Sequence, residues 1–253
     1  MRKLQQWMVE DTGVVWSEER DQTMLVVAGQ SAETVVWVEE GAVEVLGTGG
    51  GAEGWVCHIH RAPCLLGLAE LLHGVPEHVE SARALGPVRV TRIQASTIRE
   101  LLFADPELLR EATTALTERL LASARVGMLP GTEAETRLAW LFTAYGHAAG
   151  RREGQTIRLP IRRTQAQLAR AIGGSERSVN RVITRWKSDR LVDKVFGEHV
   201  LYRPAELARR AAGARDEDLA ETQRPANDDL VDTQPPTSSE DRSFSTQRVG
   251  VAR

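Results

Sequence analysis

Three residues in one short segment carry side chains that can recognise base pairs. Arg177, Asn180 and Arg181 follow one another at steps of three residues and one residue, outside the apolar positions of a helical pattern. In the major groove an arginine can pair bidentately with guanine, and an asparagine with adenine. A short helix that is buried on one side and carries such residues on the other suits a major groove. We therefore predict a recognition helix that binds double-stranded DNA.

The surrounding segment, residues 164–192, supplies the elements that must position this helix. Thr164 followed by Gln167 predicts a reciprocal capping box at the start of a first helix. Gly173-Gly174 breaks that helix with a tight turn, and Ser175 can cap the second one. The second helix has an apolar stripe formed by Val179, Val182, Ile183 and Trp186. This order predicts a helix-turn-helix.

A hairpin signal and the distribution of charge favour DNA binding over an ordinary helical hairpin. Short apolar runs flank Gly197-Glu198 and predict a β-hairpin, which after a recognition helix is a wing. Residues 151–212 contain 15 Lys and Arg against 6 Asp and Glu, whereas residues 1–150 contain 12 against 20. One strongly basic module in a mildly acidic chain is explained by binding to phosphates.

We expect a second set of side chains to position the DNA backbone without reading bases. The members of this set are Gln165, Ser175, Ser178, Arg162, Arg163, Arg185 and Lys187. Glu176 is also assigned to the DNA-binding surface; it stands at the start of the recognition helix, where its negative charge interacts favourably with the helix dipole.

The N-terminal part, residues 1–104, is predicted to be a β-sandwich or barrel. Between residues 14 and 104, short Val-rich runs alternate with glycine breaks, as in MLVVAG, TVVWVEEGAVEVL, WVCHIH and VRVTRI. Gly41 separates two such runs, and we expect it to form a hairpin. The resulting fold class is α+β, with the β-domain first and helices taking over near residue 96.

A long helix is predicted over residues 105–130. Asp105-Pro106 is a helix start signal, and no proline follows within about 20 residues. Its apolar residues recur at steps of three and four, and they are Leu109, Ala112, Leu116, Leu120 and Ala124. We expect this stripe to pair with a second copy in a homodimer, because a helix-turn-helix unit usually reads two half-sites. Packing on its own β-domain is the alternative.

The DNA-binding module is assigned to residues 131–212, with an amphipathic helix over 133–149 before the helix-turn-helix. Residues 213–253 are polar and without periodicity, which predicts a disordered tail. The chain has no apolar run of about 18 residues and no secretory signal, so we expect a cytoplasmic protein that makes no membrane contact. A nucleophile–base pair, a phosphate loop and an HExxH motif are all missing, so we do not expect an enzyme.

The order of β-domain, long helix and winged helix-turn-helix resembles the Crp/Fnr family of transcription regulators over about residues 14–210. LARAIGGSERSVNRVITRWKSDRLV carries the strongest similarity. The resemblance implies a cyclic-nucleotide-binding-like β-roll, a dimer, a near-palindromic DNA site and contact with RNA polymerase. It matches Arg181 to the family's guanine-reading arginine. Glu176-Arg177 reverses the family's usual Arg-Glu order, so we expect a different half-site.

The nucleotide-binding segment of the family is altered in this chain. The family has Gly-Glu and later Arg-Ser, whereas here Leu68 follows Gly67 and Glu77-His78 stands where Arg-Ser is expected. An acidic side chain would repel the cyclic phosphate, and Arg83 does not restore the motif. We expect no bound cyclic AMP and predict no cofactor.

His58 and His60 are the one pair with ligand chemistry, since alternate residues of a strand face the same side. They could hold a metal or haem iron, with His73 or His78 completing the site. Cys57 points the other way, and Cys64 lies past a turn. A tetrahedral site needs three or four convergent ligands, so a pair of barrel-lining histidines is the simpler interpretation and no metal site is predicted. A different function also remains open, in which the chain senses an effector and its helix-turn-helix contacts protein.

Overall fold

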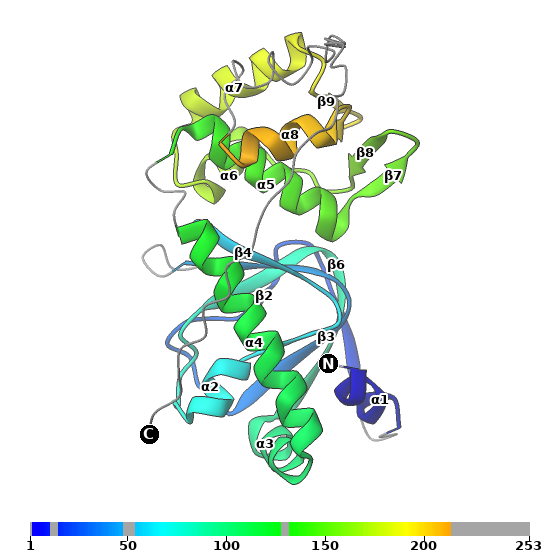
Figure 1. Cartoon of the computed structure of the whole chain (residues 1–253), viewed down its shortest axis with the longest axis vertical. Coiled ribbons are helices and arrows are strands. Elements are labelled where there is room, and N and C mark those ends of the chain that lie inside the picture. Colours follow the sequence, from blue (N-terminus) through cyan, green and yellow to red (C-terminus); the bar gives the residue numbers. More distant parts are fainter. Residues whose placement is uncertain (1, 11–14, 48–53, 128–131, 214–253) are drawn as a thin grey trace, which may run out of the picture. The chain divides into compact units, whose positions relative to one another are not determined.

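The computed structural model describes residues 2–10, 15–47, 54–127 and 132–213 (Figure 1). Its first part is an antiparallel sheet in which two long strands pair along most of their length. The strands are β1 (Trp16–Glu19), β2 (Met24–Val26), β3 (Thr34–Leu46), β4 (Val56–Arg61), β5 (Cys64–Leu66) and β6 (Ser81–Gln94). β3 pairs with β5 in its first half and with β4 in its second, while β6 pairs with β1 and β2.

The two long strands bend at glycines that face one another across the sheet. Gly41 has a φ of +96°, and a Cβ there would stand 2.7 Å from the carbonyl oxygen of Pro87. Gly86 has a φ of +79°. The pairing of β3 with β6 shifts register on both sides of Glu40, as at a β-bulge. The hairpin expected at Gly41 is therefore wrong, because the residues on both sides belong to one bent strand. A bend at this point lets each strand pair with two different neighbours.

Helices accompany the β-domain, and the longest runs along it. They are α1 (Arg2–Glu10), α2 (Leu68–His73), α3 (Ala95–Ala104) and α4 (Pro106–Gly127). The long helix predicted from Asp105-Pro106 is confirmed, and the Asp105 carboxylate accepts hydrogen bonds from the amides of Glu107 and Leu108. In Figure 1, α4 crosses the strands beside α2 and α3.

The C-terminal part contains the predicted helix-turn-helix and wing. Its elements are α5 (Ala134–Ala149), β7 (Arg151–Glu153), β8 (Thr156–Leu159), α6 (Gln165–Ala171), α7 (Glu176–Ser188), β9 (Val192–Val195), β10 (Glu198–Leu201) and α8 (Pro204–Ala211). The wing is the hairpin of β9 and β10. The segment GRREGQ, which the sequence presents as a polar connection, instead forms β7 and the turn that leads to β8. These strands extend the wing into a four-stranded sheet of order β7-β8-β10-β9. The tail predicted over 213–253 lies almost wholly outside the described residues.

One hydrophobic core joins the β-domain to the DNA-binding module. Ala42, Leu46, Val56 and Leu85 of the strands cluster with Leu138 and other residues of α5 and with the helix-turn-helix core. Burial of this shared apolar surface stabilises both parts together. The module is thus packed against the β-domain as well as linked to it through the chain.

A buried polar network lies in the same contact region. Glu44 on β3 is fully buried, pairs with Arg83 on β6 at 2.5 Å and accepts a hydrogen bond from the hydroxyl of Tyr145 on α5. Arg163 donates two hydrogen bonds to the carboxylate of Asp21, at 2.6 and 3.0 Å, and lies 3.8 Å from Glu44. Two acidic and two basic side chains therefore balance one another, and the buried members Glu44 and Arg163 are paired, as buried charges must be.

The position of Arg163 makes the network important for the DNA-binding module. Arg163 immediately precedes Thr164, the N-cap of α6, and its side chain is only 2% exposed. The prediction that Arg163 contacts DNA phosphates is wrong, because its guanidinium is directed into the protein. Burial raises the pKa of Asp21, but the hydrogen bonds from Arg163 and from the amide of Gly86 lower it overall.

Replacement of Arg163 by methionine should destabilise the protein. The variant removes both hydrogen bonds to Asp21 and leaves Glu44 without one of its two cations. We expect the free energy of unfolding to fall by about 2–4 kcal/mol, somewhat less than for a wholly buried pair because Asp21 is partly exposed. Urea denaturation measures the change. Arg162→Met, at the exposed neighbouring position, is the matched control and should stay within about 0.5 kcal/mol of the parent protein. Equal stability of the two variants would contradict the structural role given to Arg163.

Candidate nucleic-acid interface and effector pocket

The helix-turn-helix is held at both helix starts by the caps that the sequence predicts. Thr164 and Gln167 form a capping box, in which each side chain accepts a hydrogen bond from the other residue's amide at 3.2 and 2.8 Å. Gly173 makes the turn with a φ of +60°. Ser175 caps α7 by accepting the amide of Ser178 at 3.2 Å. These contacts fix where the second helix begins relative to the first.

The second helix, α7, separates its residues onto a buried and an exposed face. Val179, Val182 and Trp186 are buried, and the indole of Trp186 donates a hydrogen bond to Glu135 at 2.9 Å. The exposed face carries Arg177, Asn180, Arg181 and Thr184. Within the described residues, neither Arg177 nor Arg181 has an ion-pair partner. Their guanidinium groups are therefore available to a ligand outside the protein.

The side chains expected to position the DNA backbone fall into different environments. Gln165 is exposed, and its side-chain amide donates a hydrogen bond to the amide oxygen of Asn180 at 3.0 Å. Arg185 lies 3.4 Å from Glu135, and Lys187 lies 3.2 Å from Asp193. Both cations are more than half exposed, so weak surface pairs of this kind leave them able to reach a phosphate.

The tip of the wing carries a feature that the sequence reasoning missed. Phe196 is 91% exposed and has a φ of +52°, which is rare for a bulky residue. Gly197 follows with a φ of +84°. A two-residue turn with positive φ at both positions is typical of a tight hairpin. The β-hairpin predicted around Gly197-Glu198 is confirmed, and its turn falls one residue earlier, at Phe196-Gly197.

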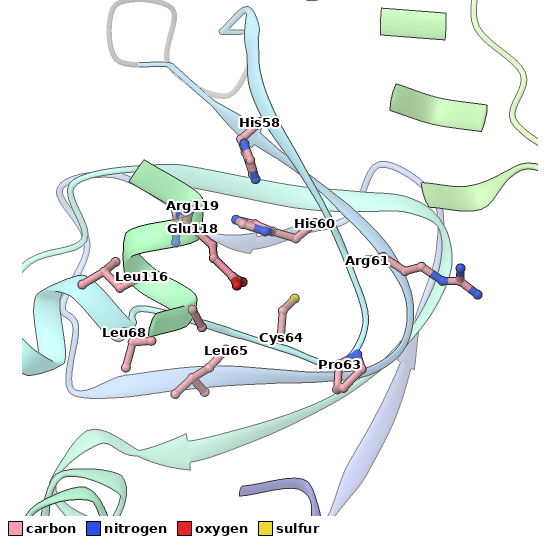
Figure 2. Close-up of a pocket in the computed structure, with 11 residues that line it drawn as sticks. His58, His60, Arg61, Pro63, Cys64, Leu65, Leu68, Leu116, Glu118 and Arg119 are labelled. Carbon is pink, nitrogen blue, oxygen red and sulfur yellow. The ribbon is translucent and has the colours of Figure 1, made fainter. Parts of the chain in front are cut away.

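A cavity of about 380 Å³ lies between the β-domain and α4 (Figure 2). His58 and His60 on β4 point into it, with ring centroids 4.2 Å apart, so the prediction that they share a face is confirmed. Cys64 on β5 faces the same space, and Leu116, Glu118 and Arg119 of α4 close it. The side chain of Arg61, by contrast, points away in Figure 2.

The cavity keeps its histidines uncharged and has a cation that is already paired. Burial, together with the charge of Arg119, lowers the pKa of His58 to about 4. Burial, then His58 and Arg119, lower the pKa of His60 to about 2. Arg119 forms an ion pair with Glu80. The Nε2 of His60 is buried and has no hydrogen-bond partner among the described residues.

The residues at the altered nucleotide-binding positions serve the protein itself. Leu68, where the family resemblance implies a ribose-binding glutamate, is 4% exposed and packs in the β-domain core. His78 is buried 3.6 Å from Glu70, and Arg83 is bound to Glu44. Leu68 and Arg83 therefore have structural partners of their own, whereas His78 is buried beside Glu70 without a hydrogen bond at its Nδ1 among the described residues.

The stripe predicted for dimerisation is divided between the core and the surface. Ala112 is 1% exposed and packs in the β-domain core, with Leu109 and Leu116 packed beside it. The prediction that Ala112 contacts a second copy is wrong, since its own subunit covers it. Leu120 is 69% exposed, and Leu121 next to it is 60% exposed. The side chain of Ala124 lies outside the described set.

The described residues contain no group of three or more His, Cys, Asp and Glu side chains arranged to hold a metal ion. None of their helices is both long and apolar enough to span a membrane.

Comparisons with known proteins agree with this architecture. Residues 19–105 match the model of the cyclic nucleotide-binding domain, and residues 136–210 match that of the Crp-like helix-turn-helix domain. A comparison with curated proteins gave no match.

Solved structures of several bacterial regulators share the fold. FixK2 from Bradyrhizobium japonicum is 17% identical, with a TM-score of 0.63 over 80% of this chain and 99% of its own. The c-di-GMP-responsive regulator CLP of Xanthomonas campestris is 18% identical, with a TM-score of 0.63 over 79% and 98%. A CRP-family transcriptional regulator from Thermus thermophilus is 19% identical, with a TM-score of 0.63 over 78% and 97%.

The fold and the exposed face of α7 define a DNA-binding transcription regulator. The chain belongs to the Crp/Fnr family, and the predicted α+β architecture of β-roll, long helix and winged helix-turn-helix is confirmed.

The buried histidines should make stability depend on pH. A histidine whose pKa is lower in the folded than in the unfolded chain binds fewer protons when folded, so stability falls as pH drops below about 6.5. We expect His60→Gln to reduce the loss of unfolding free energy between pH 7 and pH 5, as measured by urea denaturation. His73→Gln, at an exposed position, is the control and should keep the loss seen in the parent protein. A His60→Gln variant with an unchanged loss would contradict the burial of this imidazole.

Proposed function

We propose that this regulator binds a near-palindromic DNA site as a homodimer, with α7 of each subunit in the major groove. The observation that supports this most directly is the exposed face of α7, where Arg177, Asn180 and Arg181 stand on a helix fixed by its cap and buried side. Two such helices related by a two-fold axis would meet half-sites about one helical turn apart. The protein then acts by binding and not by catalysis.

Within this interface the side chains have different roles. Arg177, Asn180 and Arg181 read base edges, because they alone combine exposure with guanidinium or amide chemistry near the start of α7. Ser175, Ser178, Arg185 and Lys187 contact the phosphate backbone and set the register. Glu176 is the first residue of α7, where its negative charge interacts favourably with the positive end of the helix dipole.

The dimer forms through α4. Leu120 and Leu121 are exposed leucines next to each other on a helix whose earlier apolar residues are covered by the β-domain. A second copy of α4 would remove both from water. A dimer bound at a promoter in the cytoplasm would then also contact RNA polymerase.

Cyclic AMP is not the effector in this proposal. A cyclic phosphate needs an unpaired cation, and Arg119 and Arg83 are already bound to Glu80 and Glu44. The neutral histidines and the leucines of the cavity suit a ligand without phosphate. The alternative within this proposal is that the regulator binds DNA without any effector.

Selection of bound duplexes from a random DNA pool, with the purified protein and no added ligand, tests the proposal. Enrichment of a two-fold symmetric site supports a dimeric DNA reader that needs no cyclic nucleotide. Enrichment only after addition of cyclic AMP would contradict the proposal that cyclic AMP is not the effector. Failure to enrich any sequence, with or without nucleotide, would contradict base-specific DNA binding.

Arg181→Ala should weaken binding to the selected site by about 1–3 kcal/mol and relax the preference at one base pair of each half-site. The physical reason is the loss of two parallel hydrogen bonds to one base edge. Titration of labelled duplexes that carry each base at every position measures both effects. Arg209→Ala, in α8, removes the same charge away from α7 and is the control. Wild-type affinity of Arg181→Ala would rule out this placement of α7.

Leu120→Lys combined with Leu121→Lys should shift the protein toward monomer. The variant places two positive charges on a surface that the dimer removes from water. Sedimentation velocity measures the change, and DNA affinity should fall with it because two half-sites are no longer bound together. Phe103→Lys, at an exposed residue of α3, is the control and should remain dimeric. A double variant that is as dimeric as the parent protein would show that α4 does not form the interface.

A further inference from the structure

The hydrogen bond between Gln165 and Asn180 links the first helix of the helix-turn-helix to the recognition helix on their exposed side. We propose that Gln165 is a positioning residue that sets which base Asn180 selects. Gln165 holds the amide oxygen of Asn180, so that the NH2 group of Asn180 is the part presented to the DNA. This inference rests on the proposed function, since it assumes that α7 reads bases.

The backbone of Gln165 is held firmly enough to act as a reference point. Gln165 is the first residue of α6, and the capping box between Thr164 and Gln167 encloses it. Arg163, two residues before it, is anchored to Asp21 by two hydrogen bonds. A side chain on this segment therefore starts from a fixed position, and it reaches α7 at a distance of 3.0 Å between Gln165 Nε2 and Asn180 Oδ1.

The contact with Gln165 affects base specificity, because the orientation of the asparagine amide determines which base edge it can bind. A free asparagine reads adenine with two bonds, because its oxygen accepts from N6 while its NH2 donates to N7. In this protein the oxygen is turned toward Gln165, and the NH2 is the other arm of the same planar amide, directed away from Gln165. The group left for the DNA is a donor. It suits the acceptors of the major groove, which are O6 and N7 of guanine, O4 of thymine and N7 of adenine. Adenine, however, loses the second bond of its usual pairing, the one from its N6 to the asparagine oxygen, so guanine and thymine gain relative to it.

The side chain of Gln165 can also connect the base reader to the DNA backbone. Its NH2 has two hydrogens, and one of them is used by Asn180. The second can donate to a phosphate, as was expected of Gln165 from the sequence. One neutral amide would then hold both the backbone register and the orientation of Asn180. Because the amide carries no charge, its loss should leave the salt dependence of binding unchanged.

The test compares the base preferences of four proteins by selection from random duplexes and sequencing. They are the wild type, Gln165→Met, Asn180→Ala and the double variant. Methionine keeps the length of the side chain and removes its hydrogen bonds. We expect wild-type selection of guanine or thymine at the base contacted by Asn180, and an increase of about fivefold or more in adenine in Gln165→Met. The positions read by Arg177 and Arg181 should not change.

Three further comparisons sharpen the result. The double variant should show the same preferences as Asn180→Ala, because Gln165 acts through Asn180. Gln165→Glu can only accept, so it should turn the Asn180 oxygen outward and favour the donors of adenine and cytosine. Gln155→Met, at an exposed position of the β7–β8 turn, makes the same chemical change elsewhere in the module and should leave every preference as in the wild type.

The outcomes separate this inference from the proposed function. A uniform loss of affinity in Gln165→Met, with unchanged base preferences, would mean that Gln165 contacts only the backbone and would overturn the inference while leaving the proposed function intact. Identical preferences in the wild type and Asn180→Ala would overturn it as well. If the wild type enriched no sequence at all, the proposed function would fail, and the inference with it. Thermal melts establish that each variant is folded.

Discussion

The ion pair between Arg163 and Asp21 is the contact on which the arrangement of this protein most depends. It joins a buried arginine directly before the helix-turn-helix to a partly exposed carboxylate of the β-domain. Glu44 brings Arg83 and Tyr145 into the same network. Buried charges are tolerated only when they are paired in a defined geometry, so this network allows few alternative placements of α6. The start of α6 in turn fixes Gln165 and the capping box.

The strand that carries Glu44 also connects the network to the cavity. Glu44 pairs with Ile59 on β4, and Ile59 stands between His58 and His60. A ligand that moved the two histidines would therefore move β4. Because β4 pairs with β3, the movement would reach Glu44 and, through it, Tyr145 and Arg163. The cavity contains two uncharged histidines and an Arg119 that is paired with Glu80.

The elements whose signals are local in the sequence were predicted well. The capping box at Thr164, the cap at Ser175, the turn at Gly173 and the start of α4 at Asp105 all depend on residues within four positions of one another. Side chains at such spacings meet whatever the rest of the chain does. The apolar stripe of α7 was predictable for the same reason, because helical periodicity places Val179 and Trp186 on one face.

The sequence by itself therefore determined the fold class, the helix-turn-helix with its wing, and the chemistry of the exposed face of α7. The tertiary structure alone decided which arginines are exposed to solvent. Arg162 and Arg163 are neighbours in sequence, but only Arg163 is buried, and it pairs with Asp21, 142 residues away in the chain. It also decided that β3 bends where a hairpin was expected, that Ala112 is covered by its own subunit, and that β7 and β8 join the wing. Each of these depends on contacts between residues far apart in the chain, and no local pattern records such contacts.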